Sequence, residues 1–179
     1  MQLWNPQTTP EWELRVLYDA YDNLMAAEAL EGLCEGIVRA NMVWLQRHSE
    51  APCCLGLAGV TYIEPQGCPN SSKAGPCQTV LTTPEILRVK QATCIDIANH
   101  TTAYLRLRGI AAKTLVDNMV EAETGHPIPG MFHILTQTAD GVIDYTQDLI
   151  DGNQLRCFND CQIPVRPAGQ YAGELHHGS

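Results

Sequence analysis

Cys94 stands where an amphipathic helix is expected to begin, in the stretch TCIDIANHTTAYL, and no second cysteine lies close to it in the sequence. The thiolate is the nucleophilic form of cysteine, and a helix N-terminus or a neighbouring histidine favours that form. The first N–H groups of a helix have no partner within the helix, so the backbone N–H of Cys94 can donate to an oxyanion. This position is typical of a nucleophile in acyl transfer.

A cysteine nucleophile needs a base, and the base needs a group that orients it. Two later segments offer both, because FHIL contains His133 and VIDYT contains Asp144. Both segments have strand composition, and the Asp140-Gly141 pair between them predicts a hairpin. The sequence therefore predicts a Cys94, His133, Asp144 triad.

The register of this hairpin decides which carboxylate meets His133. With Asp140 and Gly141 as a two-residue loop, His133 falls opposite Asp148. With a four-residue loop, or with a bulge at Gly141, Asp144 comes within a diagonal of His133. Both registers place all three side chains on one face, so Asp148 is an alternative orienting acid.

Simpler roles exist for each candidate. A free cysteine is often buried, so Cys94 can be a packing residue, and His133 can be a core histidine. Asp96 is expected in the first turn of the Cys94 helix, where its charge favours the helix dipole. His100 is expected on the same helix, pointing away from the site, and His126 in a loop that borders it.

The elements that must position the triad are helices first and strands later. The segment 10–48 has helical periodicity and predicts two helices, or one helix broken near Gly32 and Gly36. TTPEILRVK predicts a short helix capped by Thr83, and the next helix should run from about Cys94 to just before Gly109.

Strand composition follows in IAAKTLVDNMV, GMFHILTQT and GVIDYT, and GVTYI predicts an edge strand earlier in the chain. This order predicts an α+β fold in which the Cys94 helix packs on a mostly antiparallel sheet. We expect a single domain over 1–179, with a helical N-terminal part over 1–50 and a catalytic core over 83–148.

The charge balance restricts the partners. The formal net charge is -9 with only 11 Lys and Arg, so nucleic acid is not expected as a partner. No stretch is long and apolar enough for a membrane span, and the first residues do not read as a signal peptide. We therefore expect a cytoplasmic protein that does not bind membranes, and its oligomeric state stays open.

The chain has eight cysteines, and six of them lie outside the two segments that carry Cys34 and Cys94. Disulfides, a metal site and buried thiols are all open for these six, although their spacing fits no standard zinc module. The rarity of recognisable disulfide spacing favours the cytoplasm. The six are Cys53, Cys54, Cys68, Cys77, Cys157 and Cys161.

The segments TPEILRVKQATCIDIANHTTAYLRLRGIAAKTLV, FHIL and VIDYT resemble the transglutaminase-like superfamily of papain-type cysteine enzymes. Its members carry a Cys, His, Asp triad in this chain order. The resemblance implies a transglutaminase-like, papain-like core with Cys94 as the nucleophile, His133 as the general base and acid, and Asp144 as the orienting acid.

The chain departs from the pattern of that family at three places. Ala92 stands where members often have glycine, Ile134 where they often have an aromatic residue, and Tyr145 where many have proline. No catalytic group is lost by these changes. The second oxyanion donor is open, and Gln91 and Gln78 are the nearest upstream candidates.

The leading hypothesis is a cysteine-dependent hydrolase or acyl transferase acting on an amide or ester bond of a protein or peptide, with a peptidase or amidase favoured over a transglutaminase. No calcium loop and no acceptor-amine pocket can be recognised. We expect no cofactor and no metal. The alternatives are a catalytically inactive structural or assembly protein that retains the fold, and a small domain stabilised by a metal on its cysteines.

Overall fold

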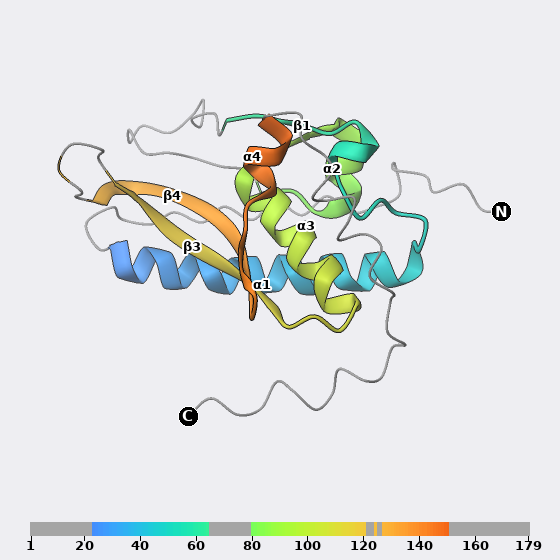
Figure 1. The fold of residues 1–179 in the computed structure, drawn as a ribbon, viewed down its shortest axis with the longest axis horizontal. Helices are drawn as coiled ribbons and strands as arrows, with labels where there is room; N and C mark the ends of the chain where they lie inside the picture. The colour runs from blue at the N-terminus through green and yellow to red at the C-terminus, as the bar shows by residue number, and fades with distance from the viewer. Residues whose placement is uncertain (1–22, 65–79, 121–123, 125–126, 151–179) are drawn as a thin grey trace.

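The computed structural model is an α+β arrangement of helices packed on small sheets (Figure 1). The long helix α1 (Asn23–Arg47) runs along one side (Figure 1). Helix α3 (Cys94–Leu107) lies between it and a layer formed by α2 (Thr83–Val89), β1 (Thr61–Tyr62) and α4 (Tyr145–Ile150) (Figure 1). The predicted α+β class, with the Cys94 helix packed against an antiparallel sheet, is confirmed. The structure describes residues 23–64, 80–120, 124 and 127–150.

Helix α1 is one continuous helix, Asn23–Arg47. The predicted break at Gly32 and Gly36 is wrong. Each glycine costs about 1 kcal/mol relative to alanine in a helix. Packing of an apolar face against α3 outweighs this cost, because tertiary contacts supply most of the stability of a helix in a protein. The part of the predicted helical segment before Asn23 lies outside the described residues.

The shorter helices are α2, Thr83–Val89; α3, Cys94–Leu107; and α4, Tyr145–Ile150. Thr82 rather than Thr83 caps α2, and it does so in a capping box with Glu85. The predicted extent of α3 is confirmed, because the helix starts at Cys94 and Gly109 follows its end with a left-handed φ of 77°.

The strands form two sheets. A parallel pair joins β1, Thr61–Tyr62, to β2, Gln91–Ala92, directly before α3. The antiparallel sheet has the order β3-β4-β5. A 3-10 turn over Gly56–Ala58 precedes β1. The strands of the antiparallel sheet are β3, Ala112–Val120; β4, Pro127–Thr138; and β5, Gly141–Ile143.

The hairpin of β4 and β5 has the register predicted for the longer loop. Gln137 pairs with Val142 and Thr138 with Gly141, so Ala139 and Asp140 form the turn itself. Gly141 takes a φ of 134°, which a residue with a side chain rarely adopts. This register is the one that brings the Asp144 position within a diagonal of His133.

Three apolar clusters form the core. The Cys94 cluster lies where α1 and α3 meet the antiparallel sheet, the Ile86 cluster joins α2, α3 and α4, and the Val38 cluster joins the far ends of α1 and α3. The Cys94 cluster contains Leu30, Cys34, Cys94, Ile95, Ala98, Val116 and Ile134. The Ile86 cluster contains Cys54, Leu55, Val60, Ile86, Ala92, Ile97 and Tyr145. The Val38 cluster contains Val38, Leu45, Ala103 and Leu107.

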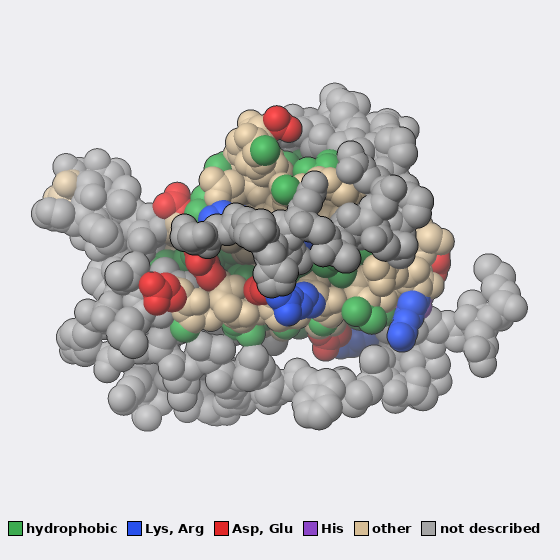
Figure 2. Space-filling model, turned by 90° about the horizontal axis from the view of Figure 1, so that it is seen from below, with side chains coloured by type: hydrophobic (Ala, Val, Ile, Leu, Met, Phe, Trp, Pro, Cys, Tyr) green, Lys and Arg blue, Asp and Glu red, His purple; other side chains and the backbone are tan. Residues whose placement is uncertain are grey.

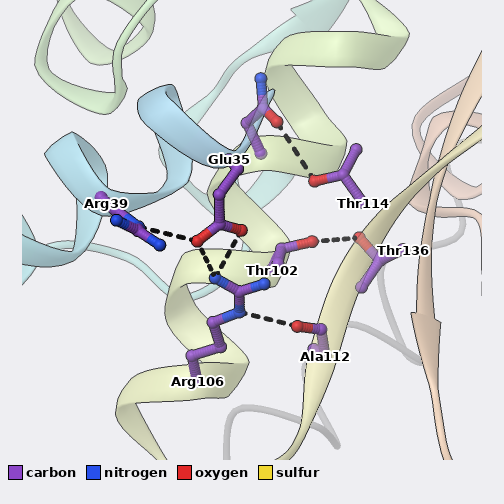
Figure 3. A network of polar contacts seen from close by, with 8 residues as sticks. Glu35, Arg39, Thr102, Arg106, Ala112, Thr114 and Thr136 are labelled. Carbon is purple, nitrogen blue, oxygen red and sulfur yellow. Dashed lines mark hydrogen bonds and ion pairs between the residues drawn. The ribbon is translucent and has the colours of Figure 1, made fainter. Parts of the chain in front are cut away.

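A polar network joins α1, α3 and β3 beside these clusters (Figure 3). Arg106 donates from Nη1 to Glu35 at 2.9 and 3.0 Å and from Nε to the carbonyl of Ala112 at 2.7 Å. Arg39 donates to the same carboxylate at 2.9 Å. Burial would raise the pKa of Glu35, but the two guanidinium groups outweigh burial and lower it. The network holds α3 against both α1 and the sheet.

No helix among the described residues is long and apolar enough to cross a membrane. On the face shown in Figure 2, acidic and basic side chains of the described residues lie at separate points rather than in one patch of a single sign.

Candidate active site

Cys94 is the first residue of α3, and it is 4% exposed. Thr93 caps the helix in a capping box with Asp96. One oxygen of Asp96, Oδ2, accepts from the N–H and the Oγ1 of Thr93, both at 2.9 Å. The first helical residue has no intrahelical partner for its N–H, so the N–H of Cys94 points out of the start of the helix.

Asp96 also ties this helix start to the chain before α2. Its Oδ1 accepts from the N–H of Leu81 at 2.7 Å. Burial raises the pKa of Asp96 to about 6, although the hydrogen bonds from Leu81 and Thr93 act in the opposite direction. The predicted place of Asp96 in the first turn is confirmed, but it holds the backbone together in addition to facing the helix dipole.

His133 and Asp144 form an ion pair. Nε2 of His133 lies 2.8 Å from Oδ2 of Asp144, and each side chain is 33% exposed. The other oxygen of Asp144 accepts from the N–H of Thr146 at 3.0 Å, at the position of an N-cap to α4. Asp144 is therefore fixed by the helix that follows it, and it holds the ring of His133 in one orientation.

Cys94 is the third member of this group, because its side chain is the largest cause of the raised pKa of His133. Since Nε2 faces Asp144, Nδ1 is the ring nitrogen left for the thiol. The side chain of Cys94 raises the pKa of His133 to about 9, burial opposes the rise, and the hydrogen bond and charge of Asp144 add to it. The three predicted residues are thus brought together in the order Cys94, His133, Asp144.

The alternative candidates fall elsewhere. Asp148 belongs to α4, so the strand alternation that made it a rival of Asp144 ends before it. Gln91 is exposed on β2, where it pairs with Thr61. Gln78 and His126 lie outside the described residues.

His100 points away from the site, as predicted. Its Nδ1 lies 3.0 Å from Oγ1 of Thr83 and its Nε2 lies 3.2 Å from the carbonyl of Cys53. Burial lowers the pKa of His100 to about 4, against the opposing effect of the backbone carbonyls. A neutral ring that donates from Nε2 and accepts at Nδ1 satisfies both contacts, so His100 links α3 to α2 and to the chain before β1.

Two residues near the site were missed by the sequence reasoning. Tyr62 on β1 packs against both the Cys94 cluster and the Ile86 cluster. Asp117 on β3 lies directly opposite His133 in the antiparallel register, but it is not among the main causes of the raised pKa of that histidine. The spacing of a strand gives only its faces, so neither residue could be assigned without the pairing of β1 and β3.

The cysteines near the site divide into two kinds. Cys53 and Cys54 each take part in a disulfide, so their thiols do not serve a metal in this structure. Cys34 and Cys94 are free. Cys68, Cys77, Cys157 and Cys161 lie outside the described residues. Within the described ranges, no group of three or more His, Cys, Asp or Glu side chains is arranged to hold a metal ion.

Comparisons with family models, with curated proteins and with solved structures found no match to this chain.

Proposed function

We propose that the chain is a cysteine-dependent hydrolase or acyl transferase of transglutaminase-like, papain-like fold. The observation that carries the proposal is the ion pair of His133 with Asp144, next to a thiol at a helix N-terminus that itself raises the pKa of His133. The arrangement of a cysteine-bearing helix on an antiparallel sheet that supplies the histidine supports the same fold. A fold alone would not suffice, because one fold hosts many functions.

The contacts support a specific sequence of steps. His133 takes the proton of Cys94, and the resulting imidazolium is stabilised by the carboxylate of Asp144. The thiolate attacks the carbonyl carbon, and the backbone N–H of Cys94 donates to the oxygen that becomes negative. His133 then protonates the leaving amine or alcohol, and a thioester to Cys94 remains.

Water is the acceptor that we propose for this thioester. His133, neutral again, removes a proton from water, and the hydroxide releases the acid and the free thiol. The substrate class is an amide or ester bond of a protein or peptide, and a peptidase or amidase is favoured over a transglutaminase.

A second candidate is a structural or assembly protein that keeps this fold without turnover. The low exposure of the thiol favours it, because Cys94 is 4% exposed and lies within an apolar cluster. In that case Cys94 and His133 form a buried polar contact that stabilises the junction of α3 with the sheet.

The pH dependence of iodoacetamide labelling tests the proposal. We expect Cys94 to be labelled rapidly at pH 6 and Cys34 not to be labelled in the folded protein, as read by peptide mass spectrometry. Removal of the base in His133→Ala should slow the labelling of Cys94 at pH 6 by at least about tenfold. His48→Ala is the matched control, because that ring stacks on Trp44 away from the site.

Labelling of Cys94 no faster than that of a thiol in the denatured chain, with no change in His133→Ala, would overturn the enzymatic proposal. The structural role would then be favoured. Rapid labelling in wild type that survives His133→Ala would show an exposed thiol without a base, and this result would also exclude the triad.

The cytoplasmic location stays a prediction, and the disulfides of Cys53 and Cys54 weigh against it because disulfides form in oxidising compartments. Counting free thiols in protein isolated under alkylating conditions tests this point. Reduced thiols at both positions would support a cytoplasmic location.

A further inference from the structure

The proposed mechanism leaves one requirement open, which is a second donor to the oxyanion. Oxyanion sites that bind with two donors stabilise the tetrahedral state more than one backbone N–H does. Gln91 is exposed on β2 and pairs with Thr61. Neighbouring residues of a strand point to opposite faces, so Gln91 lies on the face opposite the buried Ala92.

Tyr62 lies on the other face of the β1–β2 pair, the face that carries Ala92. It pairs with Ala92 in the parallel register of β1 and β2, and Ile63 donates to the carbonyl of Ala92 at 2.9 Å. Ala92 is two residues before Cys94, so this strand pair fixes Tyr62 beside the start of α3. The ring packs against the Cys94 cluster as well as the Ile86 cluster, and it is only partly buried.

The surroundings of Tyr62 keep its hydroxyl in the donor form. Burial raises the pKa of Tyr62, and the negative charges of Cys94, Glu64 and Asp144 raise it further. Two of these three charges belong to the triad, so the phenol lies within electrostatic reach of both ends of it. Within the described part of the chain, no hydrogen bond to the Tyr62 hydroxyl is formed.

We propose that Tyr62 is a catalytic residue, whose hydroxyl donates the second hydrogen bond to the oxyanion that forms when Cys94 attacks a carbonyl. This inference rests on the proposed function. The step is a nucleophilic addition to one carbonyl group. The Cys94 sulfur bonds to the carbonyl carbon, and the π electrons move to the oxygen. The N–H of Cys94 and the O–H of Tyr62 then donate hydrogen bonds to that oxygen until the leaving group departs.

The experiment compares two reactions of the same thiol in the full chain. p-Nitrophenyl acetate acylates Cys94 through a tetrahedral oxyanion and releases p-nitrophenolate, whereas iodoacetamide alkylates the sulfur by displacement of iodide and forms no oxyanion. In Tyr62→Phe, which keeps the ring and its packing, we expect kcat/KM for p-nitrophenyl acetate to fall by about 10- to 100-fold, mainly in kcat. Iodoacetamide labelling of Cys94 should stay within about twofold of wild type, because that reaction has no oxyanion for the hydroxyl to stabilise.

Tyr104→Phe is the matched control. Tyr104 is partly buried on α3, lies under the guanidinium of Arg108 at 3.5 Å from the ring centroid, and is not part of the proposed site. Its substitution should change neither reaction. Thermal unfolding of the three proteins shows that the variants are folded.

The outcomes separate the two proposals. Equal acylation by Tyr62→Phe and wild type would overturn the role of Tyr62 and leave the proposed function intact. Loss of both reactions in Tyr62→Phe would also overturn it, since that result means a general effect on the thiol. A wild-type protein that reacts with p-nitrophenyl acetate no faster than its Cys94→Ala variant would overturn the proposed function, and the role of Tyr62 with it.

Discussion

Cys34 and Cys94 are both free, both buried and both members of one apolar cluster, with exposures of 0% and 4%. They differ in position. Cys34 lies within α1, whereas Cys94 is the first residue of α3 and raises the pKa of His133. Burial is therefore common to both thiols, whereas only Cys94 lies at a helix start beside a histidine.

The consequence of burial alone is visible at Cys34. Burial raises the pKa of Cys34 to about 12, the neighbouring side chain of Asn99 offsets part of the rise, and the charge of Cys94 adds to it. Such a thiol stays protonated and is a poor nucleophile at neutral pH. The difference between the two cysteines shows that an apolar cluster does not make a nucleophile, and that the partner and the backbone position of Cys94 are what the proposed chemistry needs.

The largest expected effect comes from replacing each of the two cysteines by alanine and comparing the results. Cys94→Ala should abolish hydrolysis of p-nitrophenyl acetate, a loss of at least about a thousandfold, because it removes the proposed nucleophile. Cys34→Ala should retain activity within a few-fold and should cost roughly 1–2 kcal/mol in the free energy of unfolding, because it removes a buried side chain from the core. Steady-state kinetics and chemical denaturation measure both. Activity that survives Cys94→Ala, or that is lost in Cys34→Ala without unfolding, would reverse the assignment.

The next effect concerns the two carboxylates near His133. Asp144→Asn keeps an acceptor for the N–H of Thr146 and so preserves the cap of α4, but it removes the charge beside the ring. We expect the pKa of His133 to fall from about 9 and kcat/KM to fall by roughly 10- to 100-fold. An NMR titration of the histidine ring measures the first change.

Asp117→Asn is the control for this change, because Asp117 lies opposite His133 across the strands but is not among the main causes of its raised pKa. Neither the titration nor the activity should change. A larger effect at Asp117 than at Asp144 would mean that the orienting acid comes from β3, and the predicted triad would then be wrong in its third member.

The sequence predicted Cys94, His133 and Asp144 because each depends on a local signal. Thr93 and Asp96 mark a helix start at Cys94, and the turn around Asp140 restricts the register to two choices. The choice between those registers needed the structure. Asp148 remained a rival for the same reason, since the alternation of VIDYT was extended past the point where Asp144 caps a helix.

Tyr62 could not be predicted in this way. β1 has two residues, and its partner β2 lies 30 positions later in a parallel pair, so no hairpin signal connects them. Parallel pairing depends on the packing of the intervening chain, which includes α2. The continuity of α1 was missed for a similar reason, because the contacts that outweigh Gly32 and Gly36 come from α3.

The smallest expected effect on the reactivity of Cys94 comes from Asp96 at the start of α3, whose titration also makes the free energy of unfolding depend on pH. This effect distinguishes the helix that holds Cys94 from the helix that holds Cys34. Because the pKa of Asp96 is raised to about 6 in the folded protein, from 3.8, the folded state binds more protons than the unfolded state between these values. The stabilisation is therefore complete below pH 3.8 and is lost as the pH rises through about 6. Relative to Asp96→Asn, which does not titrate, the free energy of unfolding of wild type should fall by roughly 2–3 kcal/mol across this window.

Chemical denaturation at pH 4, 5, 6 and 7 measures this difference, and Glu28→Gln serves as the control carboxylate because Glu28 is exposed on α1 and is not among the groups that shift the pKa of Asp96. Labelling of Cys94 by iodoacetamide should slow a few-fold in Asp96→Asn, since the amide cannot accept from Leu81 and Thr93 together and the start of α3 is less firmly held. Labelling of Cys34 should not change, because α1 is fixed by other contacts. A pH slope that is the same in Asp96→Asn and wild type would show that the titrating group lies elsewhere, and the anchoring of Cys94 by Asp96 would then be structural without any link to pH.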